Sequence, residues 1–173
     1  MHLTTAILDS STPWCVTAIL EFGSGVSTSV IGMALKHNTD EDQATAGKLI
    51  SVESEEYWAE QNNKAMHADL TDYAEIVYAP AVELYHQGEG ALRHEGVPEG
   101  SYDMVYLDGP DFRPPEFMAA MDLLALEDSL TDDVIGVIDS RHINADFLKR
   151  HFKQPFRFKY LAVPGVYTFE RVR

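Results

Sequence analysis

The sequence has one cysteine, few basic residues and no long apolar run. The single cysteine, Cys15, excludes an internal disulfide and fits a reducing compartment, so we expect a cytoplasmic protein. Against 28 Asp and Glu stand only 13 Lys and Arg, a net charge of −15, which argues against nucleic acid or an anionic membrane as a partner. No apolar run approaches the ~18 residues of a membrane span, and residues 1–12 lack the basic and apolar regions of a signal peptide.

The length of 173 residues and the hydrophobic content of 45% suit one soluble globular domain spanning residues 1–173. Apolar runs alternate with amphipathic segments, a pattern typical of β-α-β units and a largely parallel sheet. The strands are expected at residues 16–22, 48–53, 74–78, 102–107, 133–138, 156–163 and 166–172. The helices are expected at residues 27–36, 55–68, 116–127 and 144–152.

Three segments need a separate interpretation. Residues 82–100 are compatible with a short helix and loop or with a small hairpin, and we interpret them as mostly irregular. The last two strands are separated only by Pro164-Gly165, too short for a helical crossover, so they should be antiparallel neighbours. In the helix over residues 55–68, an aromatic stripe that includes Tyr57 and Trp58 is expected to pack against the sheet.

The first strand leads directly into a glycine turn and a helix. It ends at Glu21, and the turn Gly23-Ser24-Gly25 then precedes a helix that opens near Ser27. The glycines let the backbone approach a ligand closely, and the start of the helix leaves N–H donors available there. A nucleotide-like ligand is expected at such a position in an open α/β sheet. The carboxylate of Glu21 suits a cationic or hydroxyl-bearing group better than a pyrophosphate.

Further acidic strand ends, at Glu53 and Asp108, follow this turn, and the Pro164-Gly165 hairpin closes the chain. With these features the sequence resembles the class I S-adenosylmethionine-dependent methyltransferases over about residues 16–172. The resemblance implies an α/β fold, a Rossmann-like three-layer sandwich. Its seven-stranded, mostly parallel sheet would have the strand order 3-2-1-4-5-7-6 with strand 7 antiparallel.

The resemblance also implies roles for individual residues. Gly23 to Gly25 would pass beneath the methionine part of the cofactor, Glu53 would accept hydrogen bonds from both ribose hydroxyls, and Asp108 would lie beside the transferred methyl group. The implied cofactor-binding residues are Glu21, Gly23, Ser24, Gly25, Ser27, Glu53, Ser54, Ala79 and Asp108.

Two alternatives to a methyltransferase enzyme remain. A nicotinamide-binding Rossmann domain would have the pattern G-x-G-x-x-G, but Thr28 occupies the sixth position, and Glu21 stands where such strands end apolar. The other alternative is a non-catalytic methyltransferase-like module that binds a partner protein.

The resemblance extends to the methyl acceptor. Residues 102–108 are similar to the fourth strand of the cation-dependent O-methyltransferases, which implies a small hydroxylated acceptor and a Mg²⁺ ion held by Asp108 and Asp139. The third ligand position holds Ser140 instead of the family's Asn. Asp139 is also a candidate N-cap of the following helix. The family's nucleic-acid amino-methylating motif is absent, because residues 108–112 read Asp-Gly-Pro-Asp-Phe.

Without a metal ion, the acceptor proton needs a base. The candidate catalytic residues are Asp108 and His142, and His86 and His94 are weaker candidates. Only residues 1–15 precede the first strand, so few residues are available there to build an acceptor pocket. The pocket is therefore open, completed by residues 82–100, or completed by the second subunit of a homodimer.

Overall fold

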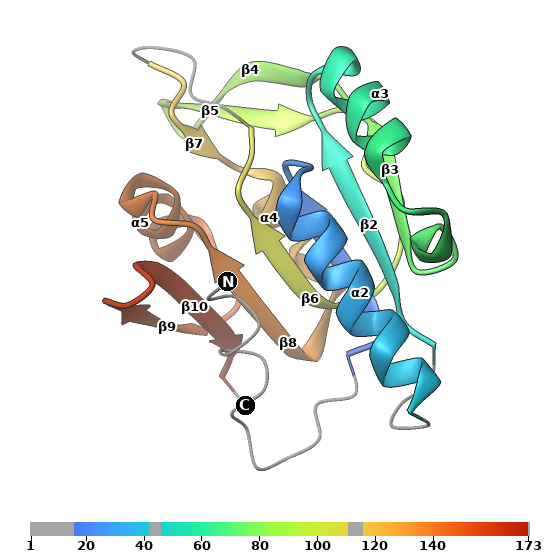
Figure 1. Ribbon diagram of the computed structural model, residues 1–173. Coiled ribbons are helices and arrows are strands. Elements are labelled where there is room, and N and C mark those ends of the chain that lie inside the picture. Colours follow the sequence, from blue (N-terminus) through green and yellow to red (C-terminus); the bar gives the residue numbers. More distant parts are fainter. Residues whose placement is uncertain (1–15, 42–45, 111–115, 173) are drawn as a thin grey trace.

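A computed structural model describes residues 16–41, 46–110 and 116–172 of the protein. Seven strands form the central sheet in the order β3-β2-β1-β6-β8-β10-β9 (Figure 1). These strands are β1 (Ala18–Phe22), β2 (Lys48–Glu53), β3 (Ala74–Tyr78), β6 (Tyr102–Leu107), β8 (Leu130–Ile138), β9 (Phe156–Leu161) and β10 (Val166–Arg171). The predicted strand order is therefore confirmed.

The directions of the strands also agree with the prediction. β1 is parallel to β2 and to β6, and the outer pairs β2 with β3 and β6 with β8 are parallel as well. β10 is antiparallel to both of its neighbours, β8 and β9. Because the parallel strands all end at the same edge, the loops that follow β1, β2, β6 and β8 meet there.

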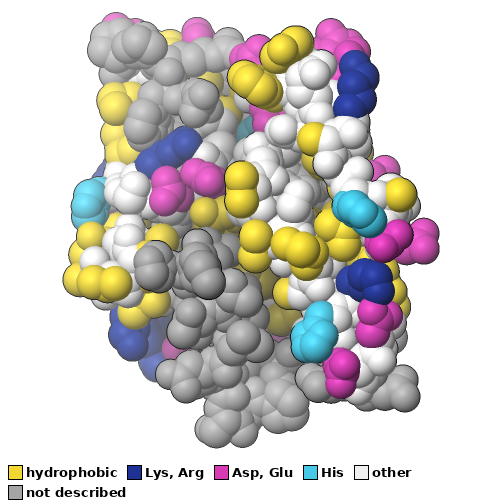
Figure 2. All heavy atoms as spheres, in the orientation of Figure 1, with side chains coloured by type: hydrophobic (Ala, Val, Ile, Leu, Met, Phe, Trp, Pro, Cys, Tyr) yellow, Lys and Arg dark blue, Asp and Glu magenta, His cyan; other side chains and the backbone are white. Residues whose placement is uncertain are grey.

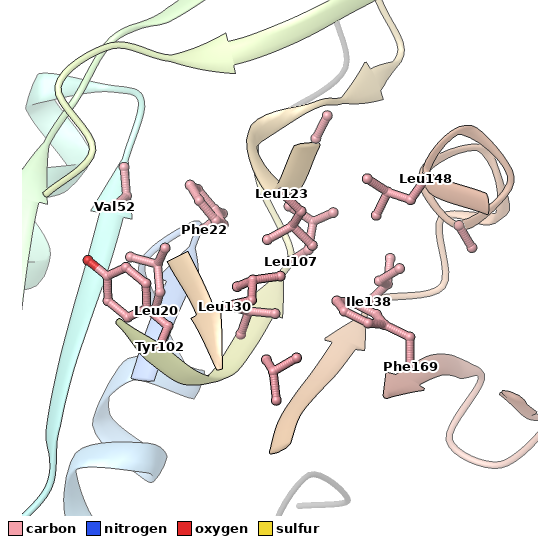
Figure 3. Packing of buried hydrophobic residues seen from close by; sticks show 14 of the residues in the cluster. Leu20, Phe22, Val52, Tyr102, Leu107, Leu123, Leu130, Ile138, Leu148 and Phe169 are labelled. Carbon is pink, nitrogen blue, oxygen red and sulfur yellow. The ribbon is translucent and has the colours of Figure 1, made fainter. Parts of the chain in front are cut away.

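Apolar side chains on the two faces of the sheet form separate cores, because successive residues of a strand point to opposite faces. On one face Ile31 and Leu35 of α2 (Val26–Asp40) pack with residues of β1 and β2. On the other face Leu20, Phe22 and Leu148 belong to a larger cluster (Figure 3). That cluster is covered by α4 (Asp122–Ala125) and α5 (His142–His151), so the sheet is the middle of three layers.

The remaining helices are short. α3 (Glu56–Ala65) packs against β2 and β3, and the two single-turn 3₁₀ helices are η1 (Ala68–Leu70) and η2 (Glu127–Ser129). No helix in the described residues combines the length and the apolar character that crossing a bilayer requires. Acidic side chains are spread over the face of the molecule seen in Figure 2, as expected for a solvated surface.

The interpretation of residues 82–100 as mostly irregular is wrong. The segment forms a hairpin of β4 (Ala81–His86) and β5 (Glu89–His94), the small hairpin that the sequence left as an alternative. Its two-residue turn has positive φ at both Gln87 (51°) and Gly88 (88°). Glutamine is an uncommon residue at the first of these positions, where Asn or Asp is favoured, so the turn gives a weak signal in the sequence.

The helix expected over residues 116–127 is wrong in its first part and is confirmed only over α4 (Asp122–Ala125). The described part of this segment forms β7 (Ala119–Ala120), which extends the β4-β5 hairpin into a three-stranded sheet, followed by α4 and the beginning of η2. Asn144 Oδ1 accepts a hydrogen bond from the Ala120 N–H (2.9 Å), and the Asp122 carboxylate accepts one from the His94 N–H (2.7 Å). These buried tertiary bonds override the helical pattern of the local sequence.

Replacing Gly136 by Ala should destabilise the protein by about 3 kcal/mol, at the upper end for overpacking a core. A Cβ at Gly136 in β8 would lie 1.9 Å from the ring of Phe169, which is 1% exposed and packed in the larger cluster. Urea denaturation of the variant measures the loss. The double variant with Phe169→Leu should recover part of the loss caused by Gly136→Ala, because the two sites are coupled. An unchanged midpoint for Gly136→Ala would contradict this packing.

Candidate cofactor cleft

A cleft of about 580 Å³ lies at the carboxyl ends of β1, β2 and β6. It is lined by Gly23, Ser24, Gly25, Val26, Ser27, Glu53, Ser54, Glu55, Trp58, Asn62, Asp108, Gly109, Pro110 and Arg141. Its volume is within the usual range for small-molecule sites, ~300–1,000 Å³. The structure thus brings together seven of the nine predicted cofactor-binding residues, which come from loops distant in sequence.

Backbone hydrogen bonds hold the first residue beyond each of the four strands β3, β1, β6 and β8. In each case the N–H of that residue donates to a carbonyl at the end of the adjacent strand. The bonds are Ala79 N–H to Glu53 O (2.8 Å), Gly23 N–H to Val52 O (2.8 Å), Asp108 N–H to Phe22 O (2.9 Å) and Asp139 N–H to Leu107 O (3.0 Å). The residues that begin these loops therefore have positions fixed by the sheet itself.

The glycine loop touches the loop after β6 backbone to backbone. Gly23 has a φ of +96°, a conformation that favours glycine. A Cβ at Gly23 would lie 3.1 Å from the Gly109 nitrogen, and a Cβ at Gly109 would lie 2.9 Å from the Gly23 nitrogen. Because neither position has room for a side chain, Asp108 is brought directly beside the glycine loop.

Glu53 is held at the centre of the cleft by four hydrogen bonds. One carboxylate oxygen accepts from the Ser24 N–H (3.1 Å) and the Ser24 hydroxyl (2.7 Å). The other accepts from the Glu55 N–H (3.0 Å) and, more weakly, from the Ser54 hydroxyl (3.5 Å). The two backbone donors fix the carboxylate, whereas the two serine hydroxyls are able to rotate away. Each oxygen can then accept one hydroxyl of a ligand, so Glu53 fits the vicinal diol of a ribose.

Helix α3 contributes residues that the sequence analysis did not assign to the site. The Asn62 amide donates to the Ser24 hydroxyl (2.8 Å) and to the Ser24 carbonyl (3.3 Å), which ties the helix to the glycine loop. Trp58 was expected to pack against the sheet, but it lines the cleft and is 54% exposed. The spacing of Trp58 and Asn62, four positions apart on the helix after Glu53, is the signal that could have revealed this face.

Asp108 lies beside the glycine loop with a perturbed acidity. Burial raises the pKa of its carboxyl to about 6, and the neighbouring negative charge of Asp139 adds to the shift, while Arg141 opposes it. The Arg141 guanidinium lies 3.7 Å from the Asp108 carboxylate and donates to the backbone carbonyls of Pro110 (2.6 Å) and Asp108. The Tyr106 hydroxyl donates to the other carboxylate oxygen (3.4 Å). Sequence reasoning missed Arg141, which is the N-cap residue of α5.

The remaining predicted residues lie outside the lining of this cleft. Glu21 is fully buried beneath the glycine loop, where it accepts a hydrogen bond from the Thr28 hydroxyl (2.5 Å). Burial raises the pKa of the Glu21 carboxyl, and nearby hydroxyls partly oppose that shift. Ala79 is 1% exposed. The exposed His142 has its Nδ1 within 2.8 Å of the Tyr167 hydroxyl. Direct roles of these residues in binding or catalysis stay predictions.

The suggested metal ligands lie close together, but the described residues do not add a third His, Cys, Asp or Glu ligand to them. The Asp108 and Asp139 carboxyls interact, as the pKa of Asp108 shows. Within the described part of the chain, no group of at least three His, Cys, Asp or Glu side chains is arranged to hold a metal ion. The N-cap of α5 is Arg141, so the alternative role of Asp139 as the helix cap is wrong. The Mg²⁺ prediction gains no support from this geometry.

The fold and the glycine loop define the class of the protein, and the comparison with known families agrees. Residues 20–140 match the family described as a methyltransferase domain, and the chain belongs to this family. Membership implies S-adenosylmethionine as the methyl donor, and it confirms the class predicted from the sequence. The particular similarity to O-methyltransferases stays a prediction.

The chain is similar to the crystal structure of the precorrin-6y C5,15-methyltransferase from Geobacter metallireducens GS-15, with 10% sequence identity and a TM-score of 0.44. The similarity covers 92% of this chain and 83% of that one. No curated protein sequence matches the chain.

Proposed function

We propose that the protein transfers a methyl group from S-adenosylmethionine to a hydroxyl group of a small molecule, with Asp108 as the general base. The observation that carries this proposal is the Asp108 carboxyl in the cleft, whose pKa is raised to about 6. A base with this pKa is largely ionised at neutral pH and still accepts a proton readily.

The donor set of the cleft supports binding of the methyl donor. Glu53 provides two oxygens for a ribose diol, and the backbone of residues 23–25 provides a close approach free of side chains. When bound, S-adenosylmethionine supplies a methyl group on a positively charged sulfur. The carboxylate of Asp108 lines the same cleft as Glu53, and its negative charge favours a cation there.

The chain's own contribution to the reaction is orientation and proton transfer. The acceptor oxygen would displace the methyl group from sulfur, so that a C–O bond forms as the C–S bond breaks and S-adenosylhomocysteine leaves, while Asp108 would take the hydroxyl proton. Arg141 holds the backbone of Asp108 and Pro110 in place, so the base keeps its position relative to the glycine loop. Orientation of this kind supplies much of the rate in a displacement without a covalent enzyme intermediate.

Incubating the protein with radiolabelled S-adenosylmethionine and pools of small hydroxylated metabolites tests the proposal. We expect label in an alkali-stable methyl ether of one pool component. If donor binding is measurable by calorimetry but no pool is labelled, the non-catalytic alternative is favoured. If the donor gives no heat and NAD(H) raises the melting temperature, the dehydrogenase-type alternative replaces the proposal.

A further inference from the structure

The basic residues of the chain are concentrated near its C-terminus. Residues 141–173 contain eight of the 13 Lys and Arg but only two of the 28 Asp and Glu. This segment includes α5, β9 and β10, and the two strands form one end of the central sheet. One end of the sheet is therefore basic in a protein whose net charge is −15. A local excess of positive charge attracts an acidic partner, which the rest of the surface repels.

The outermost strand of this basic segment has an edge that can pair with another strand. β9 is the last strand of the sheet, and among the described residues β10 is the only strand paired with it (Figure 1). An edge strand presents unpaired N–H and C=O groups to its surroundings. An extended peptide can bind such an edge as an added strand, with main-chain hydrogen bonds for affinity and alternate side chains for specificity.

Aromatic and basic side chains alternate along β9. Phe156, Phe158 and Tyr160 lie on one face, where Phe156 and Phe158 pack against the larger cluster covered by α5. Arg157 and Lys159 lie on the opposite face, because successive residues of a strand point to opposite sides. Both basic side chains are exposed. The strand thus has a basic face and an aromatic face along the same outer edge.

The positive charges of β9 are little used within the protein. Arg157 forms an ion pair with Glu170 of β10 (3.1 Å), but the pair is exposed and such pairs contribute little to stability. Lys159 lies opposite Thr168 and has no acidic partner among the described residues. Both side chains are therefore available to a partner beyond the edge.

We propose that the outer edge of β9 binds an extended segment of a partner protein in which acidic and apolar residues alternate. On an added strand, the acidic side chains lie beside Arg157 and Lys159 and the apolar ones beside Phe158 and Tyr160, because cross-strand neighbours share a face. A second copy of this chain fits the edge poorly, since antiparallel pairing of two β9 strands sets basic side chains beside basic ones. A nucleic acid supplies negative charge but no peptide groups to pair with the edge.

Peptide binding to the full chain tests the proposal. The probe is a short fluorescein-labelled peptide in which Glu and Val alternate, and its binding is followed by fluorescence anisotropy at low salt, because salt screens exposed charges. A peptide of the same composition, with Glu and Val in two separate blocks, should bind about tenfold more weakly. Equal affinity of the two peptides would overturn strand addition. A single-stranded oligonucleotide of the same net charge that binds as tightly as the alternating peptide would overturn the assignment to a protein partner.

Charge reversal provides the second readout. Lys159→Glu should raise the dissociation constant of the alternating peptide about tenfold, because an attractive cross-strand pair becomes a repulsive one. The matched control is Lys64→Glu, the same change of charge at an exposed side chain of α3, which should leave the constant within about twofold. Equal losses in the two variants would mean that the peptide responds only to net charge and would overturn the site.

Hydrogen exchange locates the contact. Backbone amides within residues 156–161 should exchange more slowly when the alternating peptide is bound, because outward N–H groups of β9 gain a partner. Protection confined to other segments would place the peptide elsewhere and overturn the proposal. The result should be the same with or without a methyl donor, since β9 does not line the cofactor cleft.

Discussion

Replacing Asp108 by Asn should slow methyl transfer by about 10²–10⁴-fold, the usual contribution of a general base. The amide keeps the size of the side chain and a hydrogen-bond acceptor, but it cannot take the proton of the acceptor hydroxyl. The measurement is the rate of methyl incorporation under single-turnover conditions with a saturating donor. Donor binding, followed by calorimetry, should persist in the variant.

The pH dependence of the rate separates proton transfer from simple damage to the site. With the pKa of Asp108 at about 6, the rate of the unaltered protein should rise as the pH increases through about 6 and then level off. The Asn variant should lose this rise. A variant that keeps full activity, or that keeps the same pH profile, would show that Asp108 is not the base.

Asp108 should also affect stability, with a sign fixed by its raised pKa. The folded state holds this proton more tightly than the unfolded state, where the pKa is near 3.8, so ionisation costs stability as the pH rises from about 3.8 to about 6. The Asn variant should therefore melt at a higher temperature than the unaltered protein at pH 8. The difference should disappear near pH 4.

Replacing Glu53 by Ala should weaken the binding of S-adenosylhomocysteine by about 100-fold or more, the effect of losing two hydrogen bonds to a charged group. The variant also loses the acceptor for the Ser24 and Glu55 N–H groups, so the glycine loop loses a support. Isothermal calorimetry measures the affinity directly, and a thermal melt establishes that the variant is folded.

Glu56→Ala is the matched control for this loss. Glu56 is also acidic and lies close by in α3, but it is exposed and does not line the cleft. Its removal should leave the dissociation constant within about threefold, because exposed charges contribute little. Equal losses in the two variants would mean that Glu53 acts only through net charge, and the assignment of the ribose site would then be wrong.

The order of the sheet could be predicted because two kinds of signal coincide. Buried parallel strands appear as short apolar runs, and their acidic ends at Glu53 and Asp108 mark the edge where the loops meet. The glycine loop could also be predicted, because the two glycines that shape it are adjacent to the first strand in the sequence. Gly23, Glu53 and Asp108 line the cleft as expected, whereas Glu21 and Ala79, also predicted at strand ends, do not.

Side chains placed by tertiary contacts were not predictable in the same way. The segment before α4 has a helical apolar pattern, but hydrogen bonds accepted by the side chains of Asn144 and Asp122 hold it in a different conformation. Trp58 has the apolar character of a core residue, and its spacing from Asn62 could be interpreted only once α3 was seen to pack against the glycine loop. Arg141 donates a hydrogen bond to the carbonyl of Pro110, which is distant in sequence, so no local sequence pattern indicates this contact.

The backbone hydrogen bonds at the strand ends have a consequence for how donor binding and acceptor recognition can change independently. The ends of β1, β2, β6 and β8 are joined by main-chain groups, so the positions of Gly23, Asp108 and Asp139 depend little on which side chains follow them. The loop residues that follow Gly23, Asp108 and Asp139 are not needed for these main-chain bonds. Recognition of a new acceptor could thus evolve by changing the outer segments, while the machinery for the methyl donor is inherited intact.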